Sequence, residues 1–237
     1  MHPLSAVSKR LRMGLSPRQL QSFDLYCRRL LAESPRAGLT SLKEPGAVQQ
    51  RHFAESLALL AALEDAGLFA SPAIDIGAGA GLPGLPMKIA RPELELTLLE
   101  ATGKKAAFLR DIVRELDLHG VTVLHGRAEE LAHDPSHRGR YRLALARAVA
   151  PLRTLVELAL PFLEPGGVLA APKGSGAQRE TEEAASALAA CGGTVERLQA
   201  LDVPGPGPAP ALVVVRKVAE TPERFPRRPG MPSKRPL

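Results

Sequence analysis

The sequence predicts an α/β fold in which a mostly parallel sheet, closed by an antiparallel hairpin, follows a small N-terminal helical cap. Two observations predict it. From Pro72 onward, short apolar runs alternate with amphipathic stretches, which is typical of βαβ units. A glycine-rich turn, IDIGAGAGLPG at residues 74–84, directly follows the first of these runs. Together they indicate a Rossmann-like sheet with a ligand at the carboxyl ends of its strands.

The N-terminal part predicts two helices. Ser16 and Pro17 supply an N-cap serine and a first-turn proline, and apolar residues at helical spacing follow them. A second helix is expected over residues 49–64, with Phe53 and Leu57 facing inward. These helices form the expected cap.

The strands of the sheet come next along the chain. The five parallel strands are expected at residues 73–76, 94–99, 121–124, 143–146 and 168–171. The closing hairpin is expected from residues 194–201 and 211–218, joined by the loop PGPGP at 204–208. Phe108, Ile112 and Leu116 lie four residues apart, which predicts a helix that covers the sheet.

The length and composition of the chain indicate how many domains it can form and what kind of partner it favours. A chain of 237 residues that is 45% hydrophobic can bury one substantial core. We therefore expect a cap at 1–70, a ligand-binding sheet domain at 71–219 and a basic, proline-rich tail at 220–237. The net charge of +6 favours a polyanionic partner, although many soluble enzymes are equally basic. With two distant cysteines and no long apolar run, the chain is expected to be cytoplasmic, without disulfide, zinc site or membrane span.

The glycine turn predicts a nucleotide-like ligand. Residues 79–84 satisfy G-x-G-x-x-G, so a dinucleotide must be considered, as must a tight turn without ligand. Asp75 discriminates, because a carboxylate at the mouth of the turn repels a pyrophosphate and attracts the cationic methionine half of S-adenosyl-L-methionine. Pro83 favours the same cofactor, since it removes a backbone N–H that a phosphate would need.

Two further carboxylates follow the next strands. Glu100 ends the second strand, where an acidic side chain usually accepts hydrogen bonds from ribose hydroxyls. Glu129 follows the third strand at the same sheet edge and could meet adenine, although a solvated carboxylate at a helix start explains it as well.

The chemistry is narrowed by what the sequence lacks. The turn after the fourth strand reads ARAVAP at 146–151, not the (N/D)-PP-(Y/F) turn of exocyclic-amine methylation, and neither Cys27 nor Cys191 is placed as a nucleophile. A ring nitrogen such as guanine N7 needs no general base, so positioning supplies most of the acceleration. Arg147 is the candidate catalytic residue, as an electrostatic or positioning group, with an ordinary surface arginine as the alternative. His133 and His137 flank Pro135, so no metal site is expected.

The sequence also suggests how RNA would be bound. Aromatic residues make up 3% of the chain and Trp is absent, so few base-stacking platforms exist. RNA contact would then depend on Arg and Lys, with Lys104, Lys105 and the basic tail as candidates.

Several motifs of the chain resemble those of one family, the bacterial small-subunit ribosomal RNA guanine-N7 methyltransferases, also called glucose-inhibited division protein B. The likeness spans nearly the whole chain. It is carried by RHFAESL at 51–57, DIGAGAGLPG at 75–84, GKK at 103–105 with Phe108 and Leu109, RAE at 127–129, RAVA at 147–150, PKG at 172–174 and PRRPGMPSK at 226–234.

The resemblance implies a class I methyltransferase that transfers a methyl group to N7 of the guanine at position 527 of 16S rRNA. The cofactor contacts expected from the loop and from the resemblance are Asp75, Gly77, Gly79, Gly81, Leu82, Glu100, Ala101, Thr102, Ala128, Glu129 and Arg147. The expected RNA contacts are Lys104, Lys105, Lys173, Arg227, Arg228 and Lys234. The expected partner is 16S rRNA or the small subunit, and the protein is expected to act as a monomer.

Two other functional classes are also compatible with the sequence. The basic tail would also suit a non-catalytic ribosome assembly factor with a vestigial nucleotide pocket. The literal G-x-G-x-x-G would suit an NAD-dependent oxidoreductase.

Overall fold

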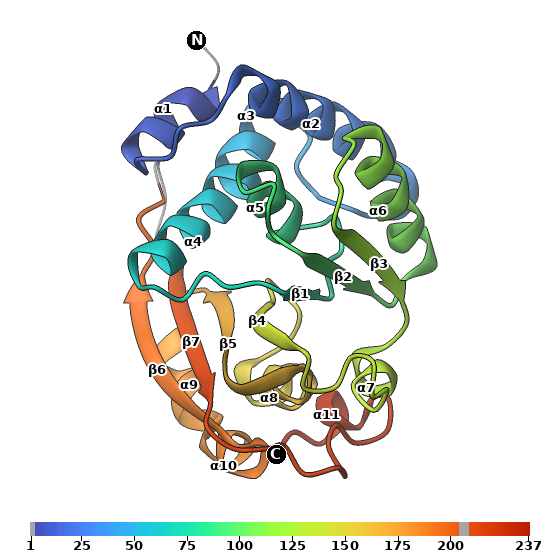
Figure 1. Ribbon diagram of the computed structural model, residues 1–237, viewed down its shortest axis with the longest axis vertical. Helices are drawn as coiled ribbons and strands as arrows, with labels where there is room; N and C mark the ends of the chain where they lie inside the picture. The colour runs from blue at the N-terminus through green and yellow to red at the C-terminus, as the bar shows by residue number, and fades with distance from the viewer. Residues whose placement is uncertain (1–2, 204–208) are drawn as a thin grey trace.

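The computed structural model describes residues 3–203 and 209–237, and within them it contains one seven-stranded sheet (Figure 1). The strand order is β3-β2-β1-β4-β5-β7-β6, with β1 to β5 parallel and β7 antiparallel to both of its neighbours. The strands are β1 (Ala73–Ile76), β2 (Leu96–Glu100), β3 (Val121–His125), β4 (Tyr141–Leu145), β5 (Leu163–Lys173), β6 (Gly193–Ala200) and β7 (Ala211–Lys217). The predicted α/β class with its closing hairpin is confirmed. The expected loop at 204–208 lies outside the described residues.

The strand order fixes where a ligand can bind. β1 pairs with β2 on one side and with β4 on the other, so the direction of winding reverses between β1 and β4. In open sheets of this type, the crevice at the carboxyl ends of the two strands that flank such a reversal is the ligand site. The glycine turn leaves β1 at this point.

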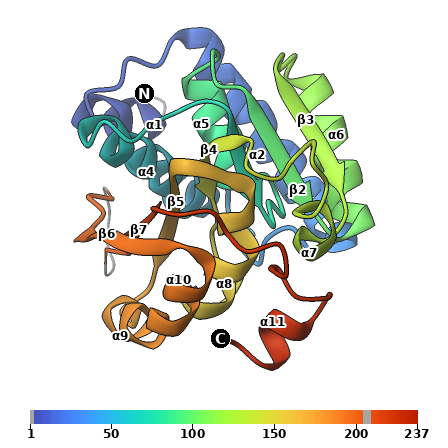
Figure 2. The same cartoon turned by 60° about the horizontal axis from the view of Figure 1, so that its bottom comes forward.

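Helices cover both faces of the sheet (Figures 1 and 2). One layer contains α2 (Pro17–Ala37), α4 (Ala54–Asp65), α5 (Gly84–Ala90) and α6 (Gly103–Glu115). The other contains α8 (Leu152–Ala159), the short 3-10 helix η2 (Leu160–Phe162), α9 (Ala177–Glu183) and α10 (Ala185–Cys191). Side chains of a strand alternate between its faces. Ala73 therefore packs in the first core, whereas Ile74 and Ile76 pack in the second.

The N-terminal helices differ in part from the prediction. Ser16 caps α2 with a complete capping box, as its sequence predicts. The expected helix at 49–64 is instead α3 (Pro45–Val48), a π-helical turn η1 (Gln49–Phe53) and α4. The N–H of Ala54 donates to the carbonyl of Gln49, five residues earlier, and apolar spacing does not reveal this extra residue. A further helix, α1 (Pro3–Arg10), was not predicted.

The expected cap and tail pack closely against the sheet domain. Leu4 and Phe53 belong to the same buried cluster as Leu98 of β2. In the tail, Phe225 is 5% exposed and α11 (Met231–Lys234) contacts α8. The remaining helix, α7 (Ala128–Leu131), lies beside α8 and α11 in Figure 1. Across the two described ranges, no helix combines the length and apolarity that crossing a bilayer requires.

The backbone of Gly84, where α5 begins, lies too close to β1 and β2 to admit a side chain. A Cβ on Gly84 would lie 2.8 Å from Asp75 Oδ2 and 3.1 Å from Leu98 Cδ2. Gly84→Ala should therefore lower the free energy of unfolding by about 1–3 kcal/mol, because a packed interior must shift to admit the methyl group. Gly14→Ala is the matched control, since no atom of the described part of the chain lies within 4 Å of the added Cβ. Equal urea midpoints for the two variants would contradict this account of the packing at Gly84.

Candidate active site at the carboxyl ends of β1 and β4

Three hydrogen bonds fix the glycine turn from below. Gly84 N donates to Asp75 Oδ2 over 2.8 Å, and Gly79 N donates to Glu100 Oε2 over 2.8 Å. From α2, the buried Tyr26 hydroxyl donates to the carbonyl of Ala80. Gly77 and Gly79 have φ of 66° and 59°, backbone conformations that residues with a Cβ rarely adopt. The turn is therefore held in one shape before any ligand arrives.

Asp75 lies beneath this turn rather than at its mouth. The residue is 0% exposed, and none of the residues that the structure describes hydrogen-bonds its buried Oδ1 atom. Burial raises the pKa of Asp75 to about 7, against the opposing effects of the Gly84 hydrogen bond and of Arg147. The carboxyl is thus only partly ionised at neutral pH. Its expected contact with the methionine half of the cofactor stays a prediction, and the unpartnered Oδ1 leaves it free to accept a bond.

Glu100 is committed to the turn and to the start of α6. Its carboxylate accepts from Gly79 N and, over 2.7 Å, from Thr102 N, and the residue is 6% exposed. Ala101 and Thr102 follow it at the surface. Each carboxylate oxygen has a second lone pair, so the expected ribose contact is compatible with these bonds.

Two of the expected contact residues turn inward. Gly81 and Leu82 are buried, and a Cβ on Gly81 would lie 2.4 Å from Leu85 Cδ1. The third glycine of the turn therefore permits close packing of α5, and Gly77 is the glycine that faces solvent.

Ala128 and Glu129 begin α7, at the carboxyl end of β3. Ala128 is half-buried. Glu129 is 8% exposed, and its Oε1 accepts from Gly230 N over 2.9 Å. The solvated-carboxylate alternative is therefore excluded for Glu129, whereas its contact with adenine stays a prediction.

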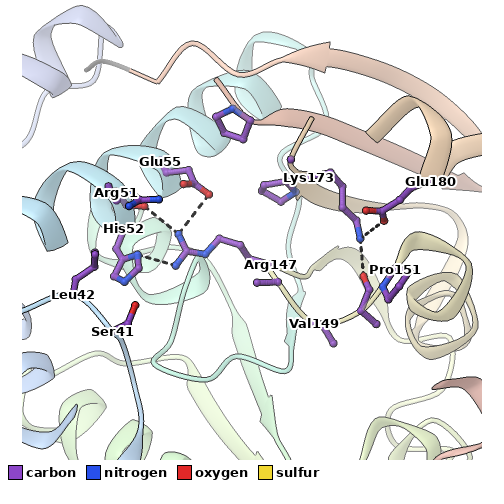
Figure 3. A pocket seen from close by; sticks show the side chains of 15 residues that line it. Ser41, Leu42, Arg51, His52, Glu55, Arg147, Val149, Pro151, Lys173 and Glu180 are labelled. Atoms are coloured by element: carbon purple, nitrogen blue, oxygen red, sulfur yellow. Dashed lines mark hydrogen bonds and ion pairs between the residues drawn. The ribbon is translucent and has the colours of Figure 1, made fainter. Parts of the chain in front are cut away.

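Arg147 points into a pocket of about 570 Å³ that the sequence did not predict (Figure 3). Its guanidinium bonds to His52 Nδ1 over 3.0 Å and lies 3.5 Å from Glu55 Oε1. A longer bond of 3.4 Å reaches the carbonyl of Arg51, in the π-helical turn. The Arg147 side chain is 15% exposed, so it is not an ordinary surface arginine.

His52 presents a lone pair to this arginine. Burial, followed by the charge of Arg147, lowers the pKa of His52 to about 4, so the ring is neutral at pH 7. With Nδ1 accepting from Arg147, Nε2 carries the proton and donates to Thr40 Oγ1, 2.8 Å away. The roles of His52 and Glu55 were missed from the sequence, although both lie in the RHFAESL motif.

The pocket borders the glycine turn. A Cβ on Gly77 would lie 3.0 Å from Val149 Cγ2, so the segment after β4 packs over the start of the turn. At the other end of the pocket, Lys173 Nζ donates to the carbonyl of Ala150 over 2.6 Å and pairs with Glu180 at 2.8 Å (Figure 3). A ligand on the turn and a substrate in the pocket would therefore be neighbours.

The expected RNA contacts fall into two groups. Lys104, Arg228 and Lys234 are exposed and Lys105 is half-buried, which leaves them accessible to a polyanion. Lys173 and Arg227 are instead engaged within the protein, with Glu180 and with the fully buried Glu157. The RNA contact expected of each stays a prediction.

The remaining candidates from the sequence are the two cysteines and the two histidines that flank Pro135. Cys27 and Cys191 are both buried, and burial raises the pKa of both thiols, that of Cys191 to about 12. His133 Nε2 lies 2.8 Å from the carbonyl of Pro226, and His137 Nδ1 lies 3.0 Å from the Tyr141 hydroxyl. Within 3–203 and 209–237, no group of three or more metal-ligating side chains is present.

The sheet order and the glycine turn define a class I methyltransferase, and solved structures of this class share the fold. A candidate O-methyltransferase from Klebsiella pneumoniae superimposes with a TM-score of 0.57 at 19% identity, over 91% of this chain and 96% of that one. A SAM-dependent methyltransferase from Aquifex aeolicus gives a TM-score of 0.52 at 17% identity, over 73% and 93%.

The chain belongs to the family described as rRNA small subunit methyltransferase G, which matches residues 19–204. A ribosomal RNA small subunit methyltransferase G from Roseiflexus castenholzii is 46% identical, over 95% of this chain and 94% of the relative. One from Desulfitobacterium hafniense is 38% identical, over 97% and 94%. The predicted methyltransferase class and S-adenosylmethionine cofactor are confirmed, and the assembly-factor and oxidoreductase alternatives are set aside.

The buried Asp75 predicts a pH-dependent stability. Its pKa is raised by folding, so its contribution is fully present below the unfolded value and is lost as pH rises through about 7. Asp75→Asn keeps an oxygen for Gly84 N but cannot ionise. The stability of this variant relative to wild type should therefore grow by roughly 2–3 kcal/mol between pH 5 and pH 8. Urea unfolding at both pH values measures it, and a constant difference would contradict the burial of an ionisable group.

Proposed function

We propose that this protein transfers a methyl group from S-adenosylmethionine to N7 of the guanine at position 527 of 16S rRNA. The observation that carries the proposal is the pocket of Arg147, which adjoins the glycine turn at the reversal of strand order. The name shared by its relatives supports the ribosomal substrate. Such a substrate agrees with a basic chain and with a cytoplasmic location.

The residues present fit a cofactor on the turn. Gly77, Ala101 and Thr102 are exposed at the carboxyl ends of β1 and β2, and the unpartnered Asp75 Oδ1 lies below. When bound there, S-adenosylmethionine supplies an electrophilic methyl group on a sulfonium. Asp75, Gly77, Glu100 and Glu129 would hold it, from the methionine half to the adenine.

The pocket suits an acceptor that needs positioning rather than deprotonation. Guanine N7 carries an exposed lone pair, and no proton leaves when it attacks. The groups around Arg147 are consistent with this, because His52 is held as a hydrogen-bond acceptor of Arg147 and both thiols are buried away from the pocket. Arg147 would orient the base or a phosphate through its planar fork of donors.

The direct experiment is to incubate small ribosomal subunits, and separately naked 16S rRNA, with the protein and labelled cofactor. Chemical cleavage at N7-methylguanine should then map the label to position 527 in at least one form. Label at an exocyclic amine or on a pyrimidine would overturn the proposal. A parallel measurement of sedimentation during turnover would test the expected monomer.

Arg147 is the residue whose loss should reduce the rate most selectively. Arg147→Ala should lower kcat about 100-fold, because one preorganised charged donor is removed from the pocket. Arg147→Lys should recover part of this, since the charge stays but the fork is lost. Arg142→Ala in β4, at a side chain that is 60% exposed, should leave kcat unchanged. Equal rates for Arg147→Ala and Arg142→Ala would exclude Arg147 from the reaction.

The exposed basic side chains should determine the affinity for RNA rather than the rate of methyl transfer. Joint substitution of Lys104, Arg228 and Lys234 by Ala should weaken RNA binding and reduce the salt slope by about one for each phosphate that is no longer neutralised. The matched control replaces three exposed arginines elsewhere with Ala: Arg18, Arg114 and Arg179. Filter binding over a salt series measures both triples, and equal slopes would place the RNA on another surface.

A further inference from the structure

The carboxyl-terminal segment, residues 220–237, begins near the amino ends of the parallel strands and continues to α7 and α8. Arg138, in the loop before β4, donates to the carbonyls of Thr221, Pro222 and Phe225 at the start of the segment. The segment leaves β7, passes α10 and ends in α11 beside α8 and α7 (Figures 1 and 2).

Pro226 lies at the end of α7, where its carbonyl is 2.8 Å from His133 Nε2. On α8, Thr154 Oγ1 donates to the carbonyl of Pro232 over 3.1 Å. We call this segment the strap.

A buried ion pair anchors the strap to α8. Glu157 is 0% exposed and lies among apolar residues of the second core. Three donors of Arg227 reach its carboxylate: Nη2 at 2.7 Å, the backbone N at 2.8 Å and Nε at 2.9 Å. Arg227 Nη2 also donates to the carbonyl of Arg235 over 2.8 Å. A charge buried so completely requires such a partner, so the position of Arg227 is strongly determined.

Three residues further on, the strap reaches a carboxylate of the cofactor site. Gly230 N donates to Glu129 Oε1 over 2.9 Å. Gly230 has φ of 81° and stands at the start of α11, so a glycine there lets the N–H face α7 without strain. A charge-assisted bond of this kind restricts the rotation of the Glu129 side chain.

We propose that the strap is a positioning element for the cofactor: the Arg227–Glu157 pair fixes it on α8, and Gly230 N orients Glu129 toward the adenosine end of S-adenosylmethionine. This inference rests on the proposed function, in which Glu129 contacts the cofactor. Arg227 is then a positioning residue that acts through Glu129, and not a phosphate ligand. Arg228 and Lys234, which are both exposed, are the residues of the strap that we expect to contact RNA.

The test breaks the anchor without leaving a charge buried. Glu157→Gln and Arg227→Gln together remove both charges, and the shorter side chain at position 227 loses the guanidinium bonds to position 157. We expect cofactor affinity, measured by calorimetry, to fall about tenfold, as for the loss of one hydrogen bond to a charged group. The matched control is the paired change Glu196→Gln and Arg216→Gln, which removes a multiply bonded pair between β6 and β7. It should bind as wild type does.

A double-mutant cycle separates positioning from general destabilisation. Glu129→Gln alone should weaken cofactor binding, and adding the anchor change to it should cause little further loss, because both act on one side chain. Thermal unfolding checks that each variant is folded. If the anchor variant does not fold, Thr154→Val is used instead, and it should weaken cofactor binding two- to threefold without removing a charge.

Two results would overturn the proposed role of the strap. One is a folded anchor variant that binds the cofactor as tightly as wild type. The other is a combined variant whose fold-loss of cofactor affinity equals the product of the losses from the anchor change and from Glu129→Gln. Failure of the proposed function is distinguishable from both. In that case the wild-type protein itself binds no S-adenosylmethionine, or methylates no guanine, before any substitution is made.

Discussion

The site depends on two buried carboxylates that hold the glycine turn from below. Asp75 of β1 accepts from Gly84 and Glu100 of β2 accepts from Gly79, so the turn is bonded to two neighbouring strands of the sheet. Tyr26 of α2 fixes the carbonyl of Ala80, between these two glycines. Burying a carboxyl group costs free energy unless its oxygens are hydrogen-bonded. Because Asp75 Oδ1 has no partner among the described residues, part of this cost is not offset. Under the proposed function, a cationic ligand bound above Asp75 would offset this cost.

The pocket of Arg147 lies next to the glycine turn. Val149 packs over Gly77, and two residues earlier Arg147 enters the pocket. The π-helical turn before α4 presents Arg51 and His52 to the guanidinium, and the first turn of α4 adds Glu55. Residues from the N-terminal helices thus complete a pocket whose other side comes from the sheet. The helices expected as an N-terminal cap therefore also contribute side chains to this pocket.

The fold could be predicted from the sequence because its signals are local. Apolar runs and glycines located the strands, and Ser16 located the start of α2. The site was predicted only in part, because its other determinants are contacts between distant segments. No spacing in the sequence indicates that Arg147 meets His52, that Arg227 is paired with Glu157, or that burial raises the pKa of Asp75 to about 7.

The buried, partly protonated Asp75 should become fully charged when a cation binds above it. Calorimetric titration of the protein with S-adenosylmethionine near pH 6.5, in buffers of different ionisation enthalpy, counts the protons exchanged on binding. Release of a fraction of a proton, absent when Asp75 is replaced by Asn, is the predicted result. Cofactor binding with no proton released would contradict the account.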